Sequence, residues 1–175
     1  MSEAPPSPSS HSLPRRAIGL LSGIAISIAA AALVGLVIVQ GWQVIARYVL
    51  NDSPSWTEPV TLLLLSTAMS LGAAAGVHTR RHFSFSLFAD AVGPAVHRLL
   101  QVVPAVVIVA IGATMAYWGW ILLVDGLDIH AAGAEIPQSI NYLPLTIGGA
   151  LMVVFALEQL IDALTGTDPS SEGSR

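Results

Sequence analysis

Four long stretches that lack Asp, Glu, Lys and Arg constrain the fold of this chain more than any other feature. A helix needs about 20 mostly apolar residues to cross the ~30 Å hydrocarbon core of a bilayer. Every stretch is at least that long, and none shows the short, strict apolar/polar alternation of membrane β-barrels. The sequence therefore predicts an all-α integral membrane protein with four transmembrane helices. The four stretches are residues 17–46, 59–79, 99–124 and 136–157.

The low charge content excludes several classes of protein. Only 10% of the residues are charged and 54% are hydrophobic, whereas soluble domains carry about 25% charged residues. A soluble enzyme and a disordered chain do not fit this composition. The net charge of −4 also argues against nucleic acid as a partner, because phosphate binding needs a concentrated basic face. Since the chain has no cysteine, disulfides, thiolate metal sites and a cysteine nucleophile are excluded.

The chain is expected to form one membrane domain over residues 17–162 between two short tails. The first apolar stretch is too long for the 7–15-residue apolar region of a cleavable signal peptide, so we expect a retained helix. The tails, residues 1–16 and 163–175, are polar and are expected to be disordered in the cytoplasm. The predicted helices cover approximately residues 17–46, 57–79, 97–124 and 140–162.

Arginines and aromatic residues both predict that the two termini face the cytoplasm. All seven basic residues are arginines, and this orientation places only Arg47 on the far side of the membrane. That distribution agrees with the excess of positive charge in cytoplasmic loops. All four tryptophans and all three tyrosines then lie at the outer ends of the helices, where amphipathic rings favour the membrane interface.

No Asp, Glu, Lys, Arg or His lies near the middle of any stretch. Such residues cost at least about 2.5–3.5 kcal/mol at the bilayer centre, and they mark ion paths and proton relays. The chain is therefore not expected to be an enzyme, to hold a metal or cofactor, or to conduct ions by itself. Hydroxyl residues in the helices are expected to bond to their own or a neighbouring helix rather than to a substrate. These residues are Ser66, Thr67, Ser70 and Thr114.

An alternative function is a membrane anchor in a respiratory or redox complex. A haem anchor needs axial histidines inside the helix bundle, and no histidine is placed there. The alternative stays open because a quinone site needs fewer sequence signatures.

Small residues recur at a spacing of four in three of the predicted helices. Such pairs allow close approach of two helix backbones, either within this chain or with a partner. The pairs are Gly19 and Gly23, Gly72 and Gly76, and Gly112 and Ala116.

The loop between the second and third helices contains several phenylalanines beside basic residues. Residues 83–90 follow Arg81 and His82 and precede Arg98. This pattern favours a short amphipathic segment in the plane of the cytoplasmic interface. The alternative is a loop that packs against a partner.

Several short motifs occur in order along the chain, from Ala46-Arg47-Tyr48-Val49-Leu50-Asn51 through Pro54-Ser55-Trp56-Thr57-Glu58 to Arg80-Arg81-His82-Phe83. Ile136-Pro137, Tyr142-Leu143-Pro144 and Gly148-Gly149 follow. Over residues 18–162 the chain resembles the small permease subunit (Q) of TRAP transporters, the tripartite ATP-independent periplasmic transporters. It departs from the family pattern at Pro59 and Ser86, where the family often has an acidic residue.

The resemblance implies a small transmembrane subunit that scaffolds a large, multi-spanning permease subunit. In this family the large subunit carries the substrate and sodium sites, and a soluble periplasmic binding protein delivers a solute that commonly contains a carboxylate. Sodium is therefore expected in the partner and not in this chain. The implied location is the inner membrane of a bacterium.

Under this hypothesis, three residues at the outer surface are expected to contribute to the subunit interface. Arg47 is the only outer arginine, and Glu58 is its expected ionic partner. Loss of one member of such a pair costs about 3–5 kcal/mol if the pair is buried and under ~1 kcal/mol if it is exposed. Trp56 is expected to anchor the connection at the membrane interface.

Five other polar residues have expected roles at the two membrane surfaces. Arg81 and His82 are expected to meet lipid phosphate or the large subunit at the cytoplasmic interface. Asp125, Asp128 and Glu135 lie in the outer loop that has no arginine. They either dock the binding protein through its basic surface or are simply solvated.

Overall fold

The structure of the chain is a computed structural model that describes residues 12–52, 54–79, 94–131 and 137–165. Its helices are α1 (Ser12–Tyr48), α2 (Thr57–Thr79), α3 (Pro94–Asp125), the 3-10 helix η2 (Gln138–Tyr142) and α4 (Leu143–Thr165). Over these ranges the structure contains no strand, only an isolated bridge between His130 and Pro137. Among the described residues, four helices are long and apolar enough to cross a membrane, which confirms the predicted helical architecture.

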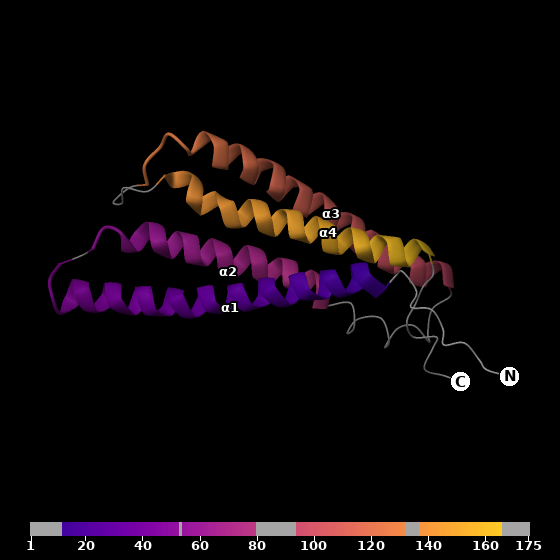
Figure 1. Cartoon of the computed structure of the whole chain (residues 1–175), viewed down its shortest axis with the longest axis horizontal. Coiled ribbons are helices and arrows are strands. Elements are labelled where there is room, and N and C mark those ends of the chain that lie inside the picture. The colour runs from indigo at the N-terminus through magenta and orange to yellow at the C-terminus, as the bar shows by residue number, and fades with distance from the viewer. Residues whose placement is uncertain (1–11, 53, 80–93, 132–136, 166–175) are drawn as a thin grey trace, which may run out of the picture.

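The four long helices lie in a row in the order α1, α2, α4, α3 (Figure 1). Helices α1 and α2 form one hairpin and α3 and α4 form the other, and α2 packs against α4 to join them. The connections within both hairpins lie at one end of the row, and the first residue of α1 and the last residue of α4 lie at the other (Figure 1). The cytoplasmic location of the second end stays a prediction.

The sequence of α1 explains why it packs on α2 along one narrow face. The buried residues on this face are small and recur every three or four positions, as one stripe of a helix requires. This stripe consists of Ser22, Ala25, Ala29 and Ala32, and Ala25 and Ala29 contact Leu71 and Ala75 of α2. Because the side chains are short, the two backbones can approach closely.

The connection after α1 turns sharply at Asn51. This residue has φ 53°, the left-handed conformation that Asn tolerates better than most residues. The N–H of Asp52 then donates to the carbonyl of Ala46 at 3.1 Å. The turn directs the chain back toward the start of α2.

Helix α2 begins at Thr57, which is completely buried. Its hydroxyl donates to the carbonyl of Pro54 at 2.8 Å. Pro59 lies in the first turn of the helix, where its missing N–H leaves no hydrogen bond unmade.

Helices α1, α3 and α4 begin at residues other than the expected ones. Helix α1 begins at Ser12 and α3 at Pro94, so both extend further than their uncharged stretches. Helix α4 begins at Leu143 rather than near residue 140, because η2 precedes it. Within that turn, the N–H of Ser139 donates to the carbonyl of Gly126 at 3.2 Å and ties η2 to the end of α3.

Two sequence-based predictions concern residues outside the described ranges. These are the amphipathic segment 83–90 and most of the two expected tails. Within the tails, only residues 12–16 and 163–165 are described, and they are helical.

Candidate functional site

Helix α4 is held between its two neighbours at a pair of adjacent glycines. A Cβ atom on residue 148 would lie 2.6 Å from the Cβ of Ser70 on α2. A Cβ on residue 149 would lie 2.6 Å from the backbone N of Ala116 on α3. Neither space can accept a methyl group without displacement of a helix, so Gly148 and Gly149 fix the spacing of α2, α4 and α3.

A hydrogen bond between α2 and α4 lies at the same crossing. The hydroxyl of Ser70 is within bonding distance of the carbonyl of Ser66 on its own helix, at 2.6 Å, and of Pro144 on α4, at 2.9 Å. Thr67 and Thr114 donate to the carbonyls of Leu63 and Ala110. These contacts agree with the expectation that membrane hydroxyls bond to their own or a neighbouring helix.

A second polar contact between α2 and α4 lies at the opposite end from the connections. The side-chain amide of Gln159 donates to the carbonyl of Val77 at 2.6 Å. This carbonyl belongs to the last turn of α2, where backbone acceptors have no partner within the helix. Gln159 therefore stabilises the end of α2 and links the two hairpins.

His78 and Glu158 add an acid–base pair beside this amide. The His78 Nδ1 and the Glu158 Oε2 atoms lie 3.7 Å apart, close enough for charge attraction when the histidine is protonated. The ring of His78 also packs against Phe155, with centroids 5.3 Å apart. Sequence reasoning missed these contacts because they join positions about 80 residues apart. The only sequence signal was the clustering of polar residues at the ends of two apolar stretches.

The predicted outer interface residues lie near the connection between α1 and α2, but they do not form one cluster. Arg47 is in the last turn of α1 and Glu58 in the first turn of α2, and both are exposed. Over the described residues no ion pair joins them. Trp56 is 45% exposed and lines an open groove that begins on α1. Their role in a subunit interface stays a prediction.

The other predicted site residues divide between the second connection and the segments outside the described ranges. Asp125 ends α3, and Asp128 follows in the turn after it. Both side chains are exposed, and the last turn of α3 lies at the same end of the row as the last turn of α1 (Figure 1). Arg81, His82 and Glu135 lie outside the described residues.

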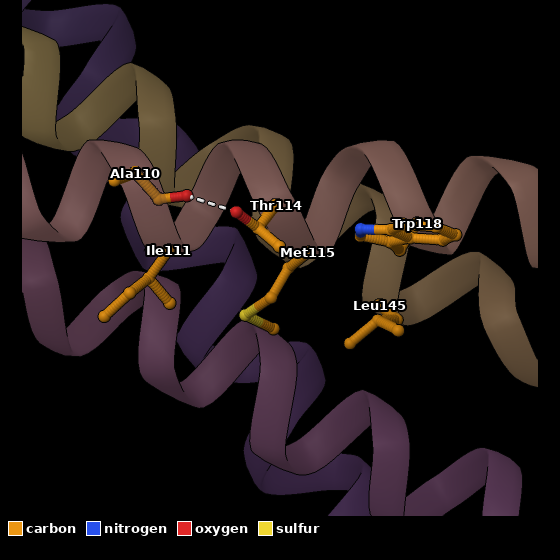
Figure 2. Close-up of a pocket in the computed structure, with 6 residues that line it drawn as sticks. All are labelled: Ala110, Ile111, Thr114, Met115, Trp118 and Leu145. Carbon is orange, nitrogen blue, oxygen red and sulfur yellow. Dashed lines mark hydrogen bonds between the residues drawn. The ribbon is translucent and has the colours of Figure 1, made fainter.

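A second groove runs along α3 beside α4 (Figure 2). It has a volume of about 480 Å³, and its lining side chains are apolar apart from one hydroxyl and the indole N–H of Trp118. That hydroxyl belongs to Thr114 and is bonded to its own helix at 2.8 Å (Figure 2). The groove therefore presents a surface for alkyl groups. Its walls are Ala110, Ile111, Thr114, Met115, Trp118 and Leu145.

Most of the apolar surface of the outermost helices has no contact within the chain. Fewer than a quarter of the residues in the apolar windows of α1 and α3 are buried. Gly19 and Gly23 on α1 have no atom near the position of an added Cβ, whereas Gly112 and Ala116 on α3 meet Gly149 of α4. The small-residue pair on α3 therefore serves packing within the chain, and α1 is open to lipid or to another helix.

Over the described residues, no group of three or more His, Cys, Asp or Glu side chains could hold a metal ion. A comparison with protein families found one matching model, described as "Tripartite ATP-independent periplasmic transporters, DctQ component". It matches residues 36–166, which include the second half of α1 and all of α2, α3 and α4. A comparison with curated proteins found no match.

Proposed function

Because this chain belongs to the family of DctQ components of tripartite ATP-independent periplasmic transporters, we propose that it is the scaffold for the large permease subunit of such a transporter. The family is one of transporter components and not of enzymes. The match supports the small permease function expected from the sequence motifs. It favours this function over the alternative of a redox anchor.

The proposed transporter takes up a solute that contains a carboxylate, driven by a sodium gradient. A periplasmic binding protein delivers the solute, and the large subunit holds the solute and sodium sites. The bacterial inner membrane is the proposed location. The sequence supports this division of tasks, because all four apolar stretches of this chain lack Asp, Glu, Lys and Arg.

The scaffold proposal rests on a contrast between two parts of the helix row. The contacts among α2, α4 and α3 are close, whereas much of the surface of the edge helix α1 is exposed. Inside the row, Gly148 and Gly149 hold three helices at close range. Outside it, α1 packs mainly on α2 and leaves its remaining surface open. A partner subunit can cover such a face without any rearrangement of the four helices.

Copurification tests this proposal most directly. The tagged chain is extracted from its native membrane in detergent, and the bound proteins are identified by mass spectrometry. We expect a large multi-spanning permease in a one-to-one ratio. Recovery of the chain with a dehydrogenase, together with a haem absorbance band, would instead establish the redox anchor.

The variant Arg47→Ala tests the outer interface. Arg47 is exposed and has no ion-pair partner among the described residues, so its partner is proposed to belong to another subunit. We expect normal membrane insertion but a lower yield of the complex or slower sodium-dependent uptake. Full copurification together with normal uptake would remove Arg47 from the interface.

A further inference from the structure

An open groove lies at the outer end of the first hairpin, between α1 and the connection to α2. Its volume is about 560 Å³. Ile38 and Val39 form its apolar part, and Trp42 lies one turn further along α1 toward the connection. Asp52, Pro54 and Trp56 form the wall on the other side.

Backbone contacts hold the wall of this groove in place. The N–H of Asp52 donates to Ala46 of α1 at 3.1 Å, which fixes the position of the carboxylate-bearing residue. The carbonyl of Pro54 accepts from the buried hydroxyl of Thr57 at 2.8 Å. These two bonds fix the backbone at Asp52 and Pro54 on this side of the groove.

The polar groups of the groove suit a cation. The carboxylate of Asp52 is exposed and has no ion-pair partner among the described residues. Trp42 and Trp56 are 46% and 45% exposed, so their indole rings remain accessible. Indole faces attract ammonium groups, most strongly where a carboxylate is nearby to add charge attraction.

The apolar groups of the same groove suit an alkyl chain. Ile38 and Val39 lie deeper in the span of α1 than Trp42, at the level of the acyl chains if the tryptophans lie at the interface. The groove therefore combines a negative, aromatic outer part with an apolar inner part. A zwitterionic lipid whose headgroup ends in an ammonium presents a cation to the outer part and an acyl chain to the inner part.

We propose that this groove binds phosphatidylethanolamine, with the headgroup ammonium beside Asp52, Trp42 and Trp56 and an acyl chain along Ile38 and Val39. The proposal rests on the insertion of α1 and α2 in a membrane and not on the transport function. A failure of one therefore leaves the other intact.

Native mass spectrometry of the full-length chain in detergent tests the proposal. The chain is titrated with phosphatidylethanolamine or with phosphatidylglycerol of the same acyl composition. We expect phosphatidylethanolamine to be retained at about five- to tenfold lower concentration, the range that one charge-assisted contact at an exposed site supplies. Equal retention of the two lipids would overturn the proposal.

Two variants and their matched controls locate the site. Asp52→Asn removes the charge and keeps the shape, and Trp42→Leu removes one indole. Each is expected to weaken phosphatidylethanolamine retention about fivefold with little effect on phosphatidylglycerol. The controls are Asp128→Asn and Trp120→Leu, which change an exposed acid and an exposed indole on the other hairpin.

Four further results would decide against the lipid. Unchanged retention in Asp52→Asn, or an equal loss in Asp128→Asn, would overturn the assignment of the site. Carbodiimide coupling of Asp52 to a lysine of a copurifying protein would show that the cation belongs to a protein. Displacement of the lipid by glycerophosphoethanolamine, which has no acyl chains, would show that the amine binds without the apolar part of the groove. The helix content and elution volume of each variant confirm that it is folded.

Discussion

Two adjacent glycines set the distances between three of the four helices. Gly148 faces Ser70 of α2, and Gly149 faces Gly112 and Ala116 of α3. In a membrane, helices do not gain from burial of apolar surface against each other, because lipid is equally apolar. Close van der Waals contact and interhelical hydrogen bonds must supply the stability, and both depend on the missing side chains at these positions.

The variant Gly148→Ala is expected to destabilise the helix row by about 1–3 kcal/mol. The added methyl would lie 2.6 Å from the Cβ of Ser70 and 2.8 Å from its carbonyl carbon, so one backbone must move. Unfolding in a detergent titration measures the effect. Gly76→Ala is the matched control, because an added Cβ there has nothing within 4 Å. Equal stability of the two variants would contradict the close contact.

The variant Gln159→Ala is expected to cost about 1 kcal/mol, which is typical of one interhelical hydrogen bond in a membrane. It removes the donor at 2.6 Å from the carbonyl of Val77. The same unfolding measurement applies, with Gln40→Ala on the exposed part of α1 as the control. If both variants unfold alike, the amide of Gln159 does not link the hairpins.

At the scale of elements, α1 lies at one edge of the row and takes most of its packing from a single neighbour, as α3 does at the other edge. It is 37 residues long, about 55 Å at 1.5 Å per residue, and its buried face is a narrow stripe of small residues. A helix of this length exceeds the ~30 Å hydrocarbon core. It must tilt or extend beyond the membrane surface.

The variant Ala29→Leu is expected to weaken the α1–α2 hairpin by about 1–3 kcal/mol. Ala29 is buried and faces Gly72 of α2, whose added Cβ would lie 3.9 Å from it. The neighbouring Ala30 is exposed, so Ala30→Leu changes the same residue type with no packing cost. Distance measurements between spin labels on α1 and α2 distinguish the two variants, and an unchanged distance in Ala29→Leu would argue against this helix contact.

At the scale of the whole molecule, the row has two chemically different ends. The end with the connections carries Arg47, Glu58, Asp125 and Asp128. The opposite end joins the hairpins through Gln159, His78 and Glu158. The start of α1 and the end of α4 both lie at this second end, and the distribution of arginines predicts that it faces the cytoplasm.

Single cysteines test this orientation cleanly because the chain has none of its own. We expect a membrane-impermeant maleimide to label Asp128→Cys in intact spheroplasts and to label Ser9→Cys only after the membrane is opened. The positive-inside distribution is the physical reason. Labelling of Ser9→Cys in closed spheroplasts would reverse the orientation.

The sequence by itself determined the helical class, the number of spanning helices and the family. Length and lack of charge are sufficient for the first two conclusions, because the bilayer requires about 20 apolar residues for each helix and a hydrogen-bond partner for every backbone group. The motifs around Arg47 and Trp56 indicated the family from local residues alone. The start of α2 was equally predictable, because proline is favoured in the first turn of a helix, where Pro59 lies.

Only the tertiary structure decided the order α1, α2, α4, α3 and the residues at each contact. All four helices are apolar on nearly every side, so hydrophobic periodicity does not indicate which face meets which neighbour. The hydrogen bond from Gln159 to Val77 joins residues far apart in the sequence. The expected ion pair between Arg47 and Glu58, which are close in the sequence, does not form between these two described residues. The positions of charged residues, aromatic residues and prolines along the sequence indicate where a membrane helix begins and ends. Which helix it packs against depends on close contacts between helix surfaces, and these appear only in the tertiary structure.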